Sequence, residues 1–180
     1  MSKVTWKPGT LLAPVPAVMV SCGTMEKPNI ITIAWTGIVN SDPAMTYISV
    51  RRERFSHALI SKSGEFVINL TTSALSRATD LCGVKSGRDT DKFALANLTP
   101  EPASKLSCPM IVQSPLSLEC KVTQVLPLGS HDMFLAKIIA VNVEESLLDE
   151  KGKLHLSRCG LLSYAHGEYF AQGRRLGGFG

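Results

Sequence analysis

Residues 29–37 read NIITIAWTG, the most strand-like part of the sequence. Side chains branched at Cβ dominate this stretch, and such side chains favour extended backbone. The apolar run Ala17–Cys22 precedes it and is separated from it by the turn-like residues Gly23–Asn29. The sequence therefore predicts a strand, a short loop and a second strand over Ile30–Trp35.

A third strand is predicted over Thr46–Arg51, where polar and apolar residues alternate. Because successive side chains of a strand point to opposite faces, Tyr47, Ser49 and Arg51 share one face, while Ile48 and Val50 share the other. One face is therefore apolar, and the other is free to meet a ligand.

The later half of the chain is also strand-like. Ser117–Leu126 and Met133–Val143 are rich in β-forming residues, and Pro127–Asp132 between them has the composition of a hairpin turn. We expect these two strands to pair in antiparallel fashion. Glu65–Leu70 is predicted to form a buried strand.

Two short helices are predicted. The first, Ser56–Lys62, has Ser56 as its N-cap and Gly64 after its end. The second, Ser73–Cys82, begins with a hydroxyl cap and is closed by Gly83. The polar segment Lys85–Lys92 that follows is predicted to be an exposed loop.

The whole chain, residues 1–180, is expected to form one domain, because no repeat, charge tract or linker divides it. Its class is predicted as mainly β, a β-barrel with a few short helices. A closed barrel also removes exposed sheet edges.

Composition limits the classes of function. Hydrophobic residues make up 44% and charged residues 19%, as in a packed globular protein. A net charge of +4 without a basic cluster does not indicate a nucleic-acid partner, but it suits one small anionic ligand. No apolar run reaches the length of a membrane span, and five scattered cysteines after no secretory signal indicate reduced thiols in the cytoplasm.

Several common sites are disfavoured by missing motifs. The sequence has neither G-x-G-x-x-G nor G-x-x-x-x-G-K-[ST], so a Rossmann site and a P-loop are not expected. Its four histidines stand far apart, and His155 with Cys159 is one isolated pair, so no metal site is predicted. A Ser-His-Asp hydrolase stays a weak rival, because G-x-S-x-G is absent.

Three segments have the residue types that a nucleotide-like cofactor needs: 29–37, 49–57 and 86–93. Ser49 and Arg51, with Ser56 and His57 at the start of a helix, can supply hydroxyl, guanidinium and backbone N–H groups to a phosphate. The backbone of Thr32–Trp35 can meet the polar edge of a flavin ring.

Plain structural readings of these segments stay open. Taken alone, Arg51, Arg52 and Arg54 are more often a solvated charge cluster than a phosphate site, and Trp35 on a strand is usually a core residue. Ser86–Lys92 has the composition of an ordinary surface loop.

Taken in order, the three segments resemble the flavin reductase-like family, and particularly its flavoredoxin-like branch. The pattern N-x-x-T-x-A-W-x-G begins at Asn29, and S-x-R-x-x-R-x-[ST]-[HY] begins at Ser49. F-V-I-N-L follows at Phe66–Leu70, and S-G-R-D-x-D-K-F occupies Ser86–Phe93. The similarity extends from about Pro14 to Gly180. Relatives often have proline where this chain has Arg52.

The resemblance implies an FMN-binding split β-barrel of Greek-key type, assembled as a homodimer with FMN near the subunit interface. It places the phosphate near Ser49, Arg51, Ser56 and His57, and the ring along Thr32–Trp35. The residues implied in cofactor binding are Asn29, Thr32, Ile33, Ala34, Trp35, Ser49, Val50, Arg51, Ser56, His57, Ser86, Gly87, Arg88, Lys92 and Phe93.

The leading hypothesis for function is hydride transfer from NAD(P)H to bound FMN, with electrons passed on to free flavin or another acceptor. His131 is a candidate on the NAD(P)H side, against the alternative of a plain hairpin residue. No side chain is assigned as a catalytic acid or base. Two rivals stay open: a non-enzymatic FMN electron carrier reduced by a redox protein, and a flavin-free binding module.

Overall fold

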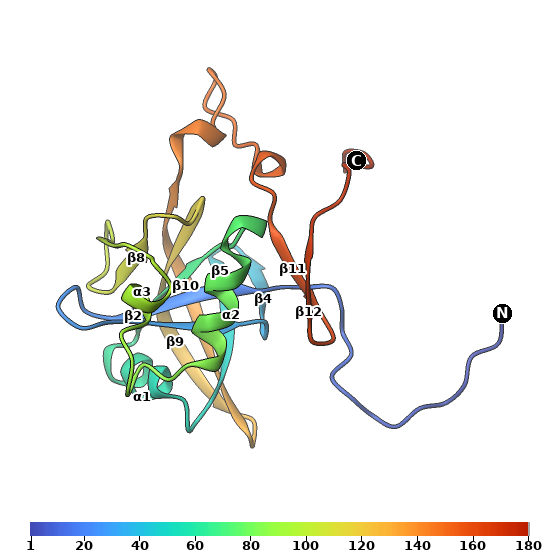
Figure 1. Ribbon diagram of the computed structural model, residues 1–180, viewed down its shortest axis with the longest axis horizontal. Coiled ribbons are helices and arrows are strands. Elements are labelled where there is room, and N and C mark those ends of the chain that lie inside the picture. Colours follow the sequence, from blue (N-terminus) through green and yellow to red (C-terminus); the bar gives the residue numbers. More distant parts are fainter. Residues whose placement is uncertain (180) are drawn as a thin grey trace.

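The computed structural model describes residues 1–179 and has a seven-stranded antiparallel sheet at its centre (Figure 1). The strand order is β3-β2-β6-β9-β10-β5-β4. In chain order these strands are β2 (Val18–Gly23), β3 (Pro28–Ile33), β4 (Thr36–Ser41), β5 (Ala44–Arg51), β6 (Glu65–Asn69), β9 (Leu116–Pro127) and β10 (His131–Val143). The prediction of a mainly β fold is confirmed.

The sheet curls into a barrel because its two outer strands are consecutive in the chain. β3 and β4 lie at opposite edges of the sheet, yet only Ala34 and Trp35 connect them. The backbone N–H of Ser49 in β5 donates to the carbonyl oxygen of Trp35 at 2.9 Å, which ties this connection to the far side of the sheet. The predicted strand therefore ends at Ile33 and not at Trp35, because the chain must turn here from one edge to the other.

The alternation predicted in β5 is confirmed. Ile48 and Val50 are buried in the barrel core, whereas Ser49 is half-buried and Arg51 exposed. The predicted hairpin is also confirmed, since β9 and β10 pair in antiparallel fashion, with two irregularities in register. Buried apolar side chains fill the barrel, each contributing about 1.5 to 3 kcal/mol by burial, and they include Val20, Ile31, Ile48, Ile60, Phe66, Ile68 and Phe134.

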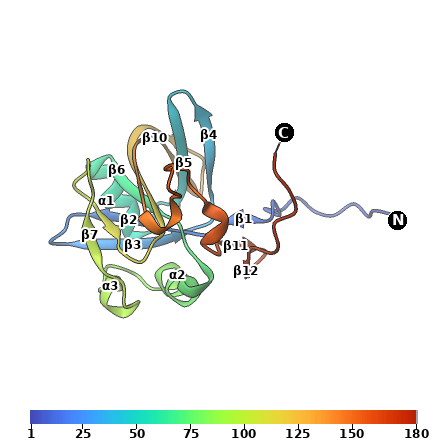
Figure 2. The same cartoon turned by 90° about the horizontal axis from the view of Figure 1, so that it is seen from above.

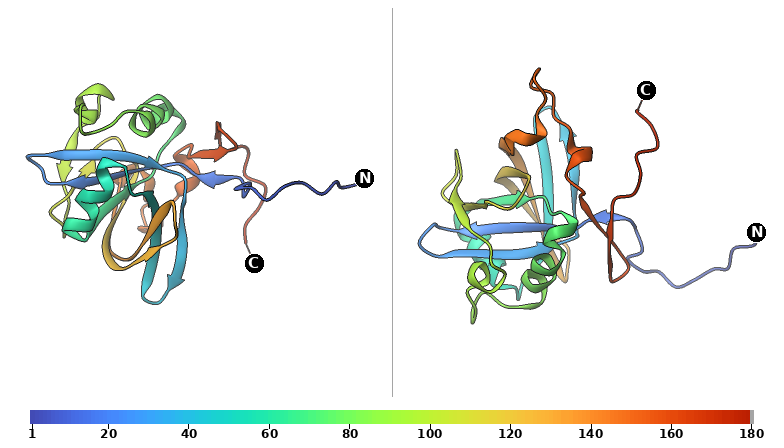
Figure 3. Two further views of the ribbon diagram at one scale, coloured as in Figure 1. Left: turned by 90° about the horizontal axis from the view of Figure 1, so that it is seen from below. Right: turned by 45° about the horizontal axis from the view of Figure 1, so that its top comes forward.

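Three helices lie against the β2–β3 hairpin: α1 (Phe55–Ser63), α2 (Ser76–Val84) and α3 (Lys92–Leu95). Figures 2 and 3 show α1 on one side of the hairpin and α2 and α3 on the other. Met19 and Ile30 of the hairpin pack with Ala78, Cys82 and Phe93 in a second core between strands and helices.

Both helix starts differ from prediction. Helix α1 has Arg54 at its N-cap with no side-chain cap, because the Ser56 hydroxyl is engaged inside the protein. The second predicted helix is divided into a 3-10 turn (Ser73–Leu75) and α2, and neither has a hydroxyl cap. Gly64 ends α1 in the left-handed region, at φ 68°, as predicted.

Gly83 lies inside α2 and does not end it. A Cβ atom on Gly83 would lie 3.3 Å from Cβ of Thr32, so glycine is there because α2 approaches β3 closely. The predicted exposed loop is also corrected at its end, because Lys92 is only 5% exposed and begins α3.

The remaining elements were not predicted. A three-stranded sheet contains β1 (Val15–Pro16), β11 (Leu162–Ala165) and β12 (Glu168–Ala171), and a two-stranded sheet contains β7 (Pro100–Pro102) and β8 (Pro109–Ile111). Two further 3-10 turns span Glu145–Leu147 and Leu156–Arg158. Residues 1–13 have no regular structure and run outward from the barrel (Figure 1).

Two structural findings bear on the class of protein. Within residues 1–179, no helix is long and apolar enough to cross a membrane. All five cysteines are free thiols, four of them buried. Burial raises the pKa of Cys22 to about 11, so this thiol is an unreactive part of the core.

Candidate functional site

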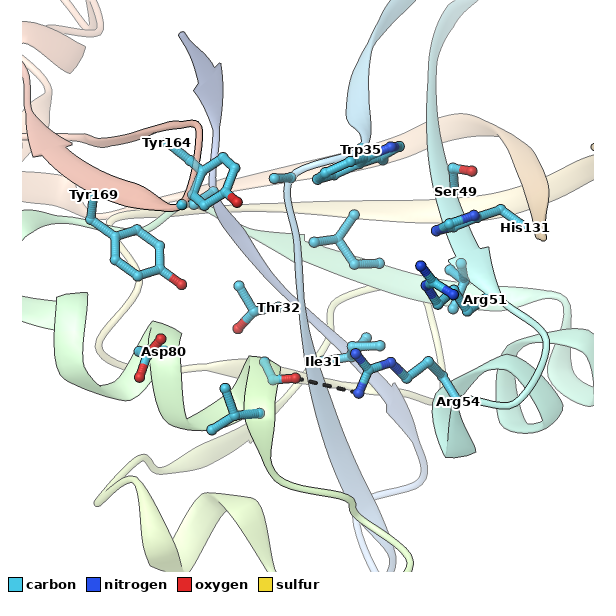
Figure 4. Close-up of a pocket in the computed structure, with 17 residues that line it drawn as sticks. Ile31, Thr32, Trp35, Ser49, Arg51, Arg54, Asp80, His131, Tyr164 and Tyr169 are labelled. Carbon is cyan, nitrogen blue, oxygen red and sulfur yellow. Dashed lines mark hydrogen bonds between the residues drawn. The ribbon is translucent and has the colours of Figure 1, made fainter. Parts of the chain in front are cut away.

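A cavity of about 400 Å³ opens where the β3–β4 connection meets β5 and α2. We call it the central cavity. It collects eight of the predicted site residues from three separate segments (Figure 4). Its lining consists of Ala17, Ile31, Thr32, Ile33, Ala34, Trp35, Ser49, Val50, Arg51, Arg54, Asp80, Gly83, Val84, His131, Tyr164, Gly167 and Tyr169.

The strand pattern explains which groups face this cavity. Ser49 and Arg51 reach it on the polar face of β5, whereas the side chain of Val50 is buried in the core. After Ile33 the chain leaves the paired strands, so the N–H groups of Ala34 and Trp35 lie outside the sheet ladder. The Thr32 hydroxyl donates to the carbonyl of Thr79, which fixes β3 against α2.

Opposite charges lie at the two ends of the central cavity. Figure 4 shows Arg51, Arg54 and His131 at one end and Asp80 with Tyr164 and Tyr169 at the other. The two tyrosine rings meet edge to face, with centroids 5.8 Å apart. Burial, together with the nearby Asp80 carboxylate, raises the pKa of Tyr169, so its phenol stays protonated.

A second cavity of about 340 Å³, which we call the loop cavity, adjoins the first and shares Ile31 and Arg54 with it. The Arg54 guanidinium reaches between the two and lies 3.5 Å from the carbonyl oxygen of Gly83. Four predicted cofactor-binding residues from the 86–93 segment contribute to its lining, which is Ile31, Glu53, Arg54, Phe55, Ser56, Lys85, Ser86, Gly87, Arg88 and Lys92.

Three predicted residues hold together the elements around these cavities. Asn29 is buried and donates through Nδ2 to the Ser56 hydroxyl at 2.7 Å. The Lys92 ammonium donates to the carbonyls of Ile30 and Cys82 at 2.7 and 2.8 Å, so it joins β3 to the end of α2. Phe93 packs in the second core and lines neither cavity.

The structure does not bring the four predicted phosphate residues together. Ser49 and Arg51 line the central cavity, Ser56 lines the loop cavity, and His57 lines neither. Nε2 of His57 lies 2.9 Å from the Asp132 carboxylate, which also accepts from Arg52 at 2.8 Å. Hydrogen bonds from Arg52 and His57 lower the pKa of Asp132, and the Arg52–Asp132 ion pair connects the residue after β5 to β10.

Sequence reasoning missed four polar or aromatic side chains of the central cavity: Arg54 as a lining residue, Asp80, Tyr164 and Tyr169. Arg54 had a signal, since it belongs to the quoted S-x-R-x-x-R pattern. The two tyrosines come from the β11–β12 hairpin, over a hundred residues from β3, and no local pattern connects them to it.

Together the two cavities form one site, with a larger compartment of mixed polarity and a smaller compartment rich in cations. Arg54, Lys85 and Arg88 carry positive charge into the loop cavity, opposed by Glu53. Charge-assisted donors of this kind bind phosphate groups. The arrangement suits a planar molecule with an anionic tail, and it contains no nucleophile activated by a neighbouring base.

The chain is similar to known proteins in both sequence and fold. Residues 11–173 match the model of the flavin reductase like domain family. A flavoredoxin of Desulfovibrio vulgaris (Miyazaki F) superposes with a TM-score of 0.91 at 30% identity, covering 98% of this chain and 97% of that chain. A flavoredoxin from Methanosarcina acetivorans gives a TM-score of 0.91 at 26% identity, covering 99% and 95%. An uncharacterised protein of Archaeoglobus fulgidus is 29% identical over 127 residues, which are 71% of this chain and 72% of the relative.

Proposed function

The chain belongs to the flavin reductase like domain family, and we propose on this premise that it binds FMN and reduces it with NAD(P)H. The observation that carries the proposal is the pair of adjoining cavities, one the size of a ring system and one rich in cations. The similar flavoredoxin folds support the same cofactor class.

The residues present fit FMN. The isoalloxazine ring would lie in the central cavity, where the backbone of Thr32–Trp35 offers donors and acceptors and Trp35 with Tyr164 offers apolar cover. The phosphate would lie in the loop cavity, held by Arg54 and Arg88 and by the Ser56 and Ser86 hydroxyls. Asn29 and Lys92 would hold Ser56, β3 and α2 in place behind it.

When bound, FMN supplies the redox chemistry, since it accepts a hydride and releases the electrons to an acceptor. The chain's own part is binding and electrostatics. The N–H groups of Ala34 and Trp35, outside the sheet ladder, would stabilise negative charge on the polar edge of the ring. Arg51 and Arg54 both lie at one end of the cavity and add positive charge there (Figure 4). No side chain has to act as an acid or base.

The nicotinamide is proposed to approach at the end that His131 borders. His131 pairs with Arg51 across β10 and β5, and its Nδ1 lies 2.9 Å from the Ser130 hydroxyl. Arg51, half-exposed, would attract the pyrophosphate of NAD(P)H there.

We propose a homodimer as the working form. Large apolar side chains are exposed on the outward-running residues 1–13 and on β4, among them Trp6, Leu12, Ile38 and Val39. Exposed apolar patches of this kind mark association sites in proteins, and a second copy of the chain would cover them.

Mixing FMN-loaded protein with NADH or NADPH in a stopped-flow spectrometer without oxygen tests the proposed function. We expect the flavin absorbance to bleach with at least one of the two nicotinamides. Tight FMN binding without bleaching would point instead to an electron carrier like the flavoredoxins it resembles, and such a protein would be reduced by a redox partner. A protein that takes up no FMN would contradict both functions.

A further inference from the structure

An apolar cavity of about 520 Å³ lies beside the central cavity and is not used by the proposed binding of FMN. We call it the apolar cavity. Its lining combines aliphatic side chains, Leu11, Leu12 and Val15, with aromatic ones, Trp35, Tyr47 and Tyr164. Its lining contains no aspartate, glutamate, lysine or arginine, in contrast to both other cavities.

The apolar cavity and the central cavity share a wall. Ala34, Trp35, Tyr164 and Gly167 line both. Trp35, which lies between two sheet strands, lines both cavities and is 42% exposed. A molecule in the apolar cavity would therefore be separated from the proposed flavin ring by at most one layer of side chains.

The chemistry of the lining selects the occupant. Nucleotides, free FMN and NAD(P)H carry phosphates, and burying an anion without a charged partner is costly. A neutral planar molecule gains from contact with Leu11, Trp35 and Tyr47, and phenol or hydroxyl groups in the wall can donate hydrogen bonds to its carbonyl oxygens. Cavities of roughly 300–1,000 Å³ hold ligands of this size.

We propose that the apolar cavity binds the electron acceptor, and that this acceptor is a small quinone. The proposal rests on the proposed function and names its second substrate. In the overall reaction the quinone gains two electrons and two protons and leaves as the hydroquinone. NAD(P)H supplies the hydride, the solvent supplies one proton, and NAD(P)⁺ is the other product.

Trp35 can report binding directly. The chain has two tryptophans, and the other, Trp6, lies on the outward-running residues and lines no described cavity. In Trp6→Phe protein without FMN, we expect 2-methyl-1,4-naphthoquinone to quench the Trp35 fluorescence in a saturable way. This readout does not depend on hydride transfer.

A matched pair of substitutions locates the site. Leu11→Glu places a carboxylate in the apolar cavity and is expected to raise the quinone Kd about tenfold or more. Leu176→Glu makes the same change at an exposed leucine that lines no described cavity, and it should leave the Kd unchanged. Both positions are on the surface, so neither change removes core packing.

Two kinds of result would overturn the binding of quinone in this cavity, and a third result would bear on the proposed function. Quenching that does not saturate, or that is equal in the two glutamate variants, would show that the quinone does not bind in this cavity. Light scattering that finds wild-type dimers but Leu11→Glu monomers, without quinone quenching, would assign the cavity to a second copy of the chain. If the protein shows no FMN absorbance after loading, the proposed function is wrong. The quinone titration uses FMN-free protein, so its result tests quinone binding independently of that failure.

Discussion

Gly87 contacts the buried amide that supports the loop cavity, so it gives a direct test of the phosphate site. A Cβ atom at this position would lie 1.8 Å from Oδ1 of Asn29, which cannot move far because its Nδ2 is bonded to Ser56. We expect Gly87→Ala to displace Asn29 and Ser56 and to weaken FMN binding by about tenfold or more, roughly 1.4 kcal/mol. Flavin fluorescence quenching measures the Kd.

Gly173→Ala is the control for this change, because a Cβ atom there meets nothing within 4 Å. An unchanged FMN Kd in Gly87→Ala would mean that the loop can shift away from Asn29 at little cost, and that the contact does not shape the site.

Two arginines in the same turn allow a second test, of the proposed phosphate ligand. Arg54 reaches between the central and loop cavities, while Arg52 is held by Asp132 away from both. Because a charge-assisted hydrogen bond contributes about 1.5 to 3 kcal/mol, Arg54→Gln should raise the FMN Kd by at least about tenfold, and Arg52→Gln should change it little.

Riboflavin distinguishes contacts to the phosphate from contacts to the ring, since it has the flavin ring but no phosphate. Its Kd should be nearly the same in the wild type and in Arg54→Gln. Equal losses for FMN and riboflavin would place Arg54 on the ring and not on the phosphate.

The sequence alone predicted the positions of some of these side chains but not of others. The alternation in Thr46–Arg51 was enough to place Ser49 and Arg51 on the polar face. It could not place His57, because its orientation depends on Asp132, a residue 75 positions later in the chain. Long-range pairing of side chains leaves no periodic signal along the sequence.

At the scale of elements, Lys92 joins three of them. Its ammonium, on α3, donates to the carbonyls that end α2 and that lie in β3. Burial lowers the pKa of Lys92. Its charged ammonium donates hydrogen bonds to both carbonyl oxygens. We expect Lys92→Met to lower the free energy of unfolding by about 2 kcal/mol, because it leaves both carbonyls without this donor.

Urea unfolding measures the change, and Lys121→Met on the exposed side of β9 is the control. If the two variants lose equal stability, the junction of β3, α2 and α3 does not depend on the Lys92 ammonium.

Glu119 fixes another junction, between β9 and the 104–106 segment. It is fully buried and accepts hydrogen bonds from Ser104, Lys105 and Leu106 and from Asn142. Burial alone would raise its pKa, but these bonds outweigh burial, and the pKa lies below its ordinary 4.5. Its folded carboxylate therefore adds stability above pH 4.5, and that contribution disappears as the pH falls through the lowered pKa.

Glu119→Gln should accordingly be about 2 to 3 kcal/mol less stable than the wild type at pH 7. The difference in the free energy of unfolding between the wild type and Glu119→Gln should become smaller as the pH falls below 4.5. Urea midpoints across this range measure it, with the exposed Glu150→Gln as the control. A gap that stays constant would show that the carboxylate charge is not what holds the segment.

The elements themselves differ in how far sequence predicts them. Long strands with β-branched residues, such as β9 and β10, were predicted within one or two residues. The break between β3 and β4 was missed, since Ala34 and Trp35 are ordinary strand residues and only barrel closure requires a turn there. Helix caps were missed because the expected hydroxyls have partners elsewhere, as Ser56 has in Asn29.

At the scale of the whole molecule, the barrel explains why the candidate site lies where it does. Closure brings the connection of β3 and β4 against β5, and α2 covers the opening from one side. Segments 32–35, 49–54 and 80–84 thereby meet, although no single motif contains them. A family resemblance could connect the first two and the 86–93 loop, whereas Asp80 and the two tyrosines required the folded chain.

At the N-terminal end, residues 1–9 line none of the three cavities described above, and a second copy of the chain would give them contacts. Val4, Trp6 and Leu12 are largely exposed there, as are Ile38 and Val39 on β4, and an apolar surface of this kind favours association. We expect the wild-type protein to have twice the mass of the 19.4 kDa chain in light scattering. Deletion of residues 1–9 should shift this mass toward the monomer, while the lining of the apolar cavity, which begins at Thr10, is kept. A truncated protein that stays dimeric would place the interface on β4 and the barrel instead, and a monomeric wild type would contradict the homodimer altogether.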